Sequence, residues 1–132
     1  MRKLRWIDGR ALLLLHSESL AEHGGLGGLR DEAALASVLA RPLHILAYEP
    51  DADIPRLAAA YGFGLIRNHP FLDGNKRAGF LAILLFLDMN GYNLEVEQAD
   101  AIQTILKVAA GKMAESQLTA WIRTHARRAR RS

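Results

Sequence analysis

Residues 68–91, NHPFLDGNKRAGFLAILLFLDMNG, are the stretch that decides the fold. Within it, residues 78–87 form a run of ten side chains with no charge and no hydrogen-bonding group. A run that is apolar on every face predicts a buried central helix, and Gly91 stands where a left-handed C-cap is expected. The run is shorter than the roughly 20 apolar residues that cross a bilayer.

The start of this predicted helix contains a local conflict. The first turn of a helix holds unsatisfied backbone N–H groups and the positive end of the helix dipole, so it favours acidic residues. Lys76 and Arg77 occupy the first turn here. Backbone amides and cations in this arrangement bind anions, phosphate above all. The sequence therefore predicts a phosphate site at the N-terminus of the central helix.

The residues before this turn supply further parts of a phosphotransfer site. His69 carries a base suited to neutral pH. Asp73 carries a carboxylate that can hold Mg²⁺, an ion usually bound by one or two carboxylates together with nucleotide phosphates. Phosphoryl and nucleotidyl transfer need little more from a protein, because their catalysis is mostly positioning and electrostatic stabilisation.

At these residues the chain resembles the Fic/Doc family, in its death-on-curing (Doc) branch. The Doc motif reads His-x-Phe-x-Asp/Asn-Ala/Gly-Asn-Lys-Arg, and residues 69–77, HPFLDGNKR, match every position. Fic proteins have a glycine where Lys76 stands and a second arginine where Phe80 stands. That glycine lets a diphosphate settle close to the backbone, so the lysine argues against AMP transfer, which stays the alternative activity.

The resemblance implies a toxin that acts as a protein kinase. It would use ATP and Mg²⁺ to phosphorylate a Ser or Thr hydroxyl, and the known target in the Doc branch is translation elongation factor Tu. His69 would take the proton from the hydroxyl, Asp73 would hold Mg²⁺ or orient His69, and Phe71 would anchor the loop in the core. The phosphates would lie against the turn and the two cations, that is, against Gly74, Asn75, Lys76 and Arg77.

The resemblance also implies a protein inhibitor. Some Fic proteins carry an inhibitory helix with a Ser/Thr-x-x-x-Glu-Gly/Asn motif, and this sequence has none. We therefore expect inhibition in trans by a small antitoxin, whose disordered segment folds as it binds a groove on the toxin. Residues 42–53 have no helical period, and the family would place a substrate-aligning flap there, as a short hairpin or a loop.

The rest of the chain predicts an all-α bundle around the central helix, as one Fic/Doc domain over residues 1–132. Asp8 is a plausible N-cap for the first helix, in which Ala11, Leu14 and Leu15 should face the core. Pro42 should end the second helix, because a residue before proline is pushed out of the helical region. Outside the central helix, helices are expected at 9–23, 31–40, 53–68, 98–110 and from 116 onward, and residues 92–94 are expected to form a link.

Composition narrows the class of protein. Half of the residues are hydrophobic and 23% are charged, which is typical of a soluble globular protein. The absence of cysteine excludes a disulfide framework and the usual zinc–cysteine clusters. The apolar segment at residues 11–15 is shorter than the roughly 7–15 residues of a secretion signal. We therefore expect a cytoplasmic protein without membrane contact.

The net charge of +3 comes from the C-terminal end of the chain. A basic tail can bind nucleic acid or an acidic partner, or it can be a solvated or frayed helix end. A third hypothesis is therefore a non-catalytic module that binds nucleic acid or the antitoxin through this tail. His16 and His23 have no acidic partner at metal-ligand spacing, which favours surface or cap positions. The tail contains Arg123, Arg127, Arg128, Arg130 and Arg131.

Overall fold

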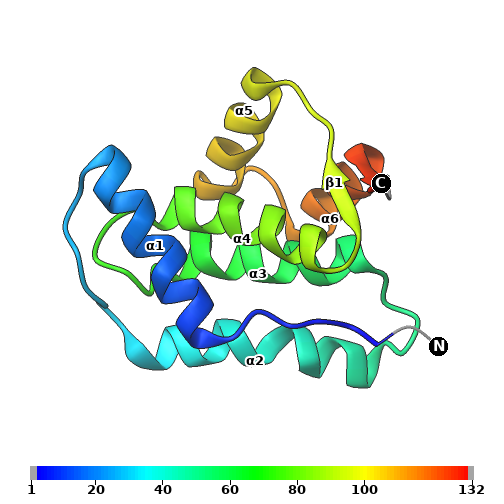
Figure 1. Cartoon of the computed structure of the whole chain (residues 1–132), viewed down its shortest axis with the longest axis horizontal. Helices are drawn as coiled ribbons and strands as arrows, with labels where there is room; N and C mark the ends of the chain where they lie inside the picture. The colour runs from blue at the N-terminus through cyan, green and yellow to red at the C-terminus, as the bar shows by residue number, and fades with distance from the viewer. Residues whose placement is uncertain (1–2, 131–132) are drawn as a thin grey trace.

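The computed structural model describes residues 3–130, which form six α-helices and one two-stranded antiparallel sheet (Figure 1). The predicted all-α fold around a buried helix is confirmed. None of the described helices is both long and apolar enough to cross a membrane. The elements are α1 Gly9–His23, α2 Glu32–Tyr48, α3 Ile54–Asn68, α4 Asn75–Met89, β1 Tyr92–Leu94, α5 Gln98–Ala109, α6 Glu115–His125 and β2 Ala126–Arg128.

The centre of the bundle is a pair of helices, α3 and α4, rather than α4 alone. The two helices lie side by side, with α2 on one side and α5 and α6 on the other (Figure 1). They approach closely where Gly62 faces Gly79, since a Cβ added at Gly79 would lie 3.0 Å from the carbonyl oxygen of Gly62. The central pair carries the motif, because the nine-residue segment 69–77 begins where α3 ends and enters α4.

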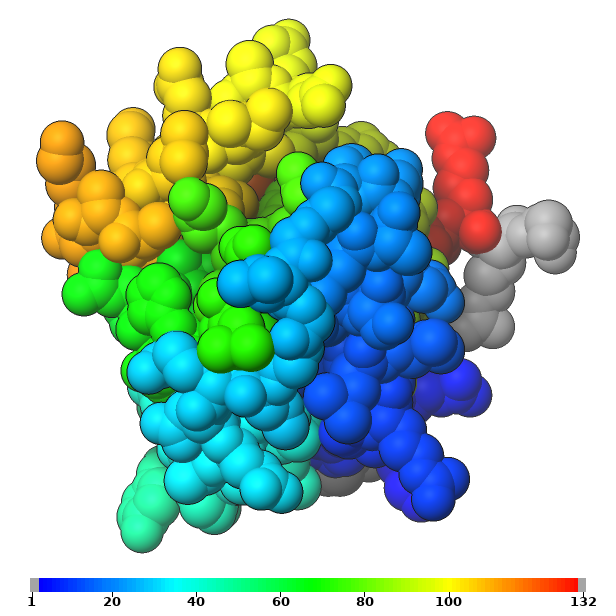
Figure 2. All heavy atoms as spheres, turned by 90° about the vertical axis from the view of Figure 1, so that its left-hand side faces the viewer, coloured from blue at the N-terminus to red at the C-terminus, as the bar shows by residue number. Residues whose placement is uncertain are grey.

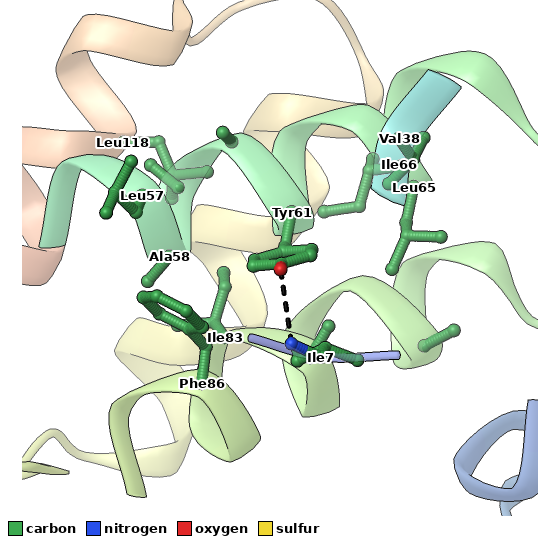
Figure 3. Packing of buried hydrophobic residues seen from close by; sticks show 14 of the residues in the cluster. Ile7, Val38, Leu57, Ala58, Tyr61, Leu65, Ile66, Ile83, Phe86 and Leu118 are labelled. Atoms are coloured by element: carbon green, nitrogen blue, oxygen red, sulfur yellow. Dashed lines mark hydrogen bonds between the residues drawn. The ribbon is translucent and has the colours of Figure 1, made fainter. Parts of the chain in front are cut away.

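Apolar side chains from both central helices fill the core. Ile83 and Phe86 of α4 pack near Leu57, Ala58 and Tyr61 of α3 (Figure 3). The buried Tyr61 hydroxyl accepts a hydrogen bond of 3.2 Å from the backbone N–H of Ile7, which ties the N-terminal segment to the bundle. Burial is the main cause that raises the pKa of the Tyr61 hydroxyl.

Aspartates begin three of the helices as the sequence suggests. The side chains of Asp8, Asp31 and Asp53 accept hydrogen bonds of 2.8 to 3.0 Å from backbone N–H groups in the first turns of α1, α2 and α3. Such caps satisfy N–H groups that have no partner inside the helix. Gly91 and Gly111 follow α4 and α5 with φ angles of 85° and 76°, as expected of left-handed helix stops.

The prediction that the second helix stops before Pro42 is wrong. Helix α2 continues through Pro42 to Tyr48, so the expected hairpin or loop at 42–48 is absent. An interior proline costs a helix about 3 kcal/mol. Burial offsets this cost, because Leu35, Val38, Pro42 and Ile45 are all buried on one face of α2.

Three other predictions need correction. Residues 92–94 are a strand rather than a link, and β1 pairs with β2 so that Tyr92 lies opposite Arg128. Residues 126–128 of the basic tail are therefore a strand and not a frayed helix end. In α1 the buried residues are Leu12, His16 and Ser19, whereas Leu14 is 60% exposed.

Candidate functional site

The motif loop begins with a left-handed residue. His69 caps the end of α3 with φ 49° and ψ 58°, and it is the only non-glycine residue with a positive φ among residues 3–130. Its side chain is exposed, whereas Pro70 and Phe71 are buried. Residues in sparsely populated backbone regions need support from their surroundings and concentrate at functional sites.

Residues 24–31, between α1 and α2, provide that support. The N–H groups of Arg30 and Asp31 both donate to the Pro70 carbonyl, at 2.8 and 3.0 Å, and the Leu72 N–H donates to the Gly28 carbonyl at 3.1 Å. The Arg30 guanidinium also donates to the carbonyls of Asn68 and His69, at 2.8 and 2.7 Å. The loop 24–31 therefore holds the motif from outside.

Asn75 holds the motif from inside. Its side-chain oxygen accepts from the Phe71 N–H, and its side-chain nitrogen donates to the Phe71 carbonyl, both at 3.0 Å. The Phe71 ring is buried, as the sequence predicts. Since the Asn75 side chain is engaged with the loop, any contact of Asn75 with a phosphate would come from its backbone.

Asp73 lies at the exposed surface of the turn. One carboxylate oxygen accepts from the Gly74 N–H at 2.9 Å, and the other accepts from the Leu26 N–H at 3.3 Å. Each carboxylate oxygen keeps a further lone pair for another partner. The two hydrogen bonds fix the direction of the carboxylate without saturating it.

The first turn of α4 is open to an anion. Gly74 precedes the helix in a left-handed conformation, no side chain caps the helix, and no acidic residue stands in the first turn. Lys76 and Arg77 are exposed. Within the described part of the chain, neither forms an ion pair with Asp88, with Glu95 or with any other carboxylate. The conflict noted in the sequence is therefore not resolved by an internal carboxylate.

A magnesium ion fits this chemistry only with help from a nucleotide. Among residues 3–130 there is no group of three or more histidine or carboxylate side chains that could hold a metal. Asp73 offers one carboxylate, which suits an ion whose remaining ligands are water and phosphate oxygens.

The structure adds a residue that the sequence did not assign to the site. His16 was expected at the surface or at a helix cap, but its side chain is only 4% exposed. Its Nε2 lies 2.8 Å from the Asp73 carbonyl oxygen, and its ring stacks on Phe71 with centroids 3.7 Å apart. No local pattern could have revealed a contact between residues 57 positions apart.

The segment that lies against the motif also differs from the expectation. The predicted flap at residues 42–53 is mostly helix α2 followed by a short turn, and no backbone hydrogen bond joins it to the motif. The glycine-bearing loop 24–31 lies there instead, with a β-bridge between Leu29 and Phe71. On the face shown in Figure 2, the green motif segment lies between α1 in blue and α5 in yellow to orange.

A groove of about 770 Å³ leads away from the cations. Lys76 and Arg77 lie at its wall, and apolar side chains of α4 and α5, among them Leu81, Leu84 and Ile105, line much of the rest. The acidic Glu18 and Glu22 of α1 line it as well. Phe80, Leu81 and Leu84 of α4 are only half-buried along this groove, so the apolar run of α4 is not buried on every face.

The basic tail is partly engaged in contacts of its own. Arg123 forms an ion pair with Asp53 at 2.7 Å, and Arg127 donates to the carbonyls of Thr124 and Ala126. Arg128 lies over the Tyr92 ring, 5.8 Å from its centroid. Arg131 lies outside the described residues.

The fold and the motif loop define a helical protein with a candidate anion site at the N-terminus of α4. The Fic/DOC family model matches residues 6–87, a span that includes α1 to α3, the motif and most of α4. The chain therefore belongs to the Fic/DOC family, which confirms the resemblance seen in the sequence.

Two curated relatives agree with this assignment. The chain is 28% identical over 120 residues to "Protein kinase doc" of Escherichia phage P1, covering 91% of this chain and 94% of that protein. It is 42% identical over 77 residues to "Toxin Doc" of Mycolicibacterium smegmatis (strain ATCC 700084 / mc(2)155), covering 56% of this chain and 58% of that protein.

Proposed function

We propose that this chain is the toxin of a toxin–antitoxin pair and that it transfers the terminal phosphate of ATP to a protein hydroxyl. The observation that carries the proposal is the uncapped start of α4, where Lys76 and Arg77 have no acidic partner within residues 3–130 and exposed His69 and Asp73 stand just before it. The relatives named as a protein kinase and as a toxin support the same activity.

The proposed reaction uses each group for one task. His69 takes the proton of the acceptor hydroxyl as its oxygen attacks the terminal phosphorus. The bond from that phosphorus to the bridging oxygen breaks, and ADP leaves. The backbone amide of Asn75, in the turn that Gly74 forms, holds the phosphate oxygens together with Lys76 and Arg77, which offset their charge. Asp73 would hold Mg²⁺, which neutralises phosphate charge when bound.

The acceptor that we propose is a Ser or Thr of translation elongation factor Tu, the target that the Doc resemblance implies. The proposed partner is an antitoxin that occupies the groove beside Lys76 and Arg77. That groove is lined largely by apolar side chains, which suits an amphipathic segment that folds on binding.

The experiment that tests the activity follows two labels. Purified chain is incubated with Mg²⁺, elongation factor Tu, and ATP labelled on either the terminal or the innermost phosphate. We expect label from the terminal phosphate alone, which is lost in His69→Ala and kept in His44→Ala, a control at an exposed histidine of α2.

Each other result has a definite meaning. Transfer of the innermost label would replace the kinase by an AMP transferase and would show that Lys76 does not exclude that reaction. Incorporation of neither label, into elongation factor Tu or into a whole lysate, would contradict the proposed enzyme. The hypothesis of a non-catalytic module would then be tested by measuring whether the basic tail binds nucleic acid and whether that binding weakens with salt.

A further inference from the structure

His16 occupies a position in α1 where a hydrophobic residue would be expected. Its neighbours along the helix, Leu13 and Leu14, are 43% and 60% exposed, whereas His16 is 4% exposed. Burying a polar ring is unfavourable unless the ring finds a hydrogen-bond partner. The partner is the backbone of the motif, so the polar atom of His16 is directed at the candidate site.

The hydrogen bond to the Asp73 carbonyl shows which nitrogen of the His16 ring carries a hydrogen. A carbonyl oxygen can only accept hydrogen bonds, so the His16 Nε2 that lies 2.8 Å from the Asp73 carbonyl must carry a hydrogen. The donor therefore fixes the plane of the peptide between Asp73 and Gly74. The same peptide supplies the Gly74 N–H, which donates to the Asp73 carboxylate at 2.9 Å.

Packing leaves the His16 ring little freedom. The ring stacks on the buried Phe71 ring at an interplanar angle of 7°. A Cβ placed on Gly74 would lie 3.5 Å from Nε2, so the ring also supports the left-handed residue that precedes α4. His16 thus contacts both sides of the motif turn, while Asn75 holds Phe71 from α4.

We propose that His16 is a positioning residue for phosphotransfer, whose Nε2–H holds the Asp73–Gly74 peptide so that the first amides of α4 are aimed at the nucleotide phosphates and the Asp73 carboxylate at the Mg²⁺ that would accompany them. This inference rests on the proposed function. His16 itself touches neither nucleotide nor acceptor in this role. Without the His16 donor, the Asp73 carbonyl loses its hydrogen-bond partner. Rotation of the Asp73–Gly74 peptide is then no longer opposed by that hydrogen bond.

The test compares two substitutions that separate the donor from the ring. His16→Phe keeps the stack on Phe71 and removes the donor, whereas His16→Gln places an amide N–H near the position of Nε2. His44→Phe, at an exposed position of α2, controls for the same change elsewhere. All variants are used as full chains, at a temperature where circular dichroism shows them folded.

Two readouts are combined. The first is the kinetics of phosphotransfer, with kcat and the KM for ATP taken separately. The second is calorimetric binding of Mg²⁺ with a non-hydrolysable ATP analogue, measured in chains that also carry His69→Ala and cannot react. We expect His16→Phe to raise the KM and weaken binding roughly tenfold or more, the effect of losing one hydrogen bond that holds a charged site.

We expect His16→Gln to restore both quantities to within about threefold of the parent, because it restores a donor of the same kind. The pH profile of kcat in His16→Gln should match the parent, since His16 carries no proton in the reaction. Parent-like kinetics and binding in His16→Phe would overturn the inference alone, and so would a His16→Gln chain as defective as His16→Phe. A parent chain that binds no nucleotide would overturn the proposed function and this inference with it.

Discussion

Asn75 and Lys76 are neighbours in the motif, but their side chains lie in different environments. The Asn75 side chain is buried, and both its oxygen and its nitrogen form hydrogen bonds with the Phe71 backbone. The Lys76 side chain is exposed at the start of α4. The motif therefore mixes residues that build the loop with residues whose side chains are open to solvent, and the spacing alone does not separate the two kinds.

A single glycine in the loop 24–31 allows a test of what positions the Asp73 carboxylate. Gly25 has a φ of 123°, and an added Cβ would lie 2.9 Å from an Asp73 carboxylate oxygen and 2.9 Å from a Leu20 methyl. We expect Gly25→Ala to displace the Asp73 carboxylate and to lower phosphotransfer at least about tenfold, because errors near 1 Å in a catalytic group are that costly.

Gly24→Ala is the matched control for this change. Gly24 also has a positive φ, of 81°, but its added Cβ would meet nothing within 4 Å. Both variants should lose about 1–3 kcal/mol of unfolding free energy, because a positive φ strains an alanine, as measured by urea denaturation. Equal activity in the two variants, with stability equally reduced, would contradict a link from Gly25 to Asp73.

At the scale of elements, helices with strong local signals could be predicted and those shaped by distant contacts could not. Asp8 and Asp53 cap α1 and α3 as expected, and the bounds of α1 are the predicted ones. The strand β1 was missed because three residues carry no alternation and their partners are more than thirty residues away. The stop at Pro42 was wrong because packing on α3 outweighs a local rule.

The contact between α3 and α4 predicts how stability responds to a single methyl group. A Cβ at Gly79 would lie 2.6 Å from Ile66 Cγ1 and 3.0 Å from the Gly62 carbonyl oxygen, and backbone cannot move aside easily. We expect Gly79→Ala to cost about 1–3 kcal/mol through overpacking. Urea unfolding, monitored by circular dichroism, measures this loss.

Gly9→Ala makes the same change at a tolerant position. A Cβ at Gly9, the first residue of α1, would lie 3.5 Å from a Leu39 methyl, an ordinary contact. This variant should be neutral or up to about 1 kcal/mol more stable, because alanine favours helix over glycine. A Gly79→Ala chain as stable as Gly9→Ala would mean that the central helices are not in the close contact described.

The ion pair between Asp53, at the start of α3, and Arg123 of α6 predicts that the free energy of unfolding depends on pH. Hydrogen bonds from the Arg123 side chain are the main cause that lowers the pKa of Asp53 below its ordinary 3.8. A carboxylate whose pKa is lower in the folded state stabilises the fold above the unfolded pKa, and that contribution is lost as the pH falls through the folded pKa. The contribution should therefore be constant near neutral pH and decline below about pH 4.

Asp53→Asn isolates this contribution, because asparagine still caps α3 but does not titrate or pair with Arg123. The difference in unfolding free energy between the parent and Asp53→Asn should stay level from pH 7 to about 5 and shrink at lower pH. Asp51→Asn, at an exposed residue without an ion pair in the described chain, should show no such change. A difference that grows on acidification would contradict the assigned role of the pair.

At the scale of the whole molecule, the motif turn and the groove share α1 and the start of α4, but only the groove includes α5. The turn depends on α1, the loop 24–31 and the motif, whereas the groove adds the apolar side chains of α5. Activity and inhibition should therefore be separable by substitutions on α5. The sequence predicted that a groove would exist through the family resemblance, but the contribution of α5 could be seen only in three dimensions.

Leu106 and Leu43 provide a matched pair for the last prediction. Leu106 lines the groove and is 49% exposed, while Leu43 lies on α2 outside the residues that line the groove and is 45% exposed. Replacing either leucine with lysine should leave folding intact, because both side chains already reach solvent. We expect Leu106→Lys to weaken binding of the proposed antitoxin by at least about tenfold, since a buried unpaired charge costs more than 1.4 kcal/mol. Leu43→Lys should bind that protein as the parent does, and both variants should keep phosphotransfer, measured with purified chains. Growth arrest that the antitoxin relieves equally in both variants would place its docking surface away from α5.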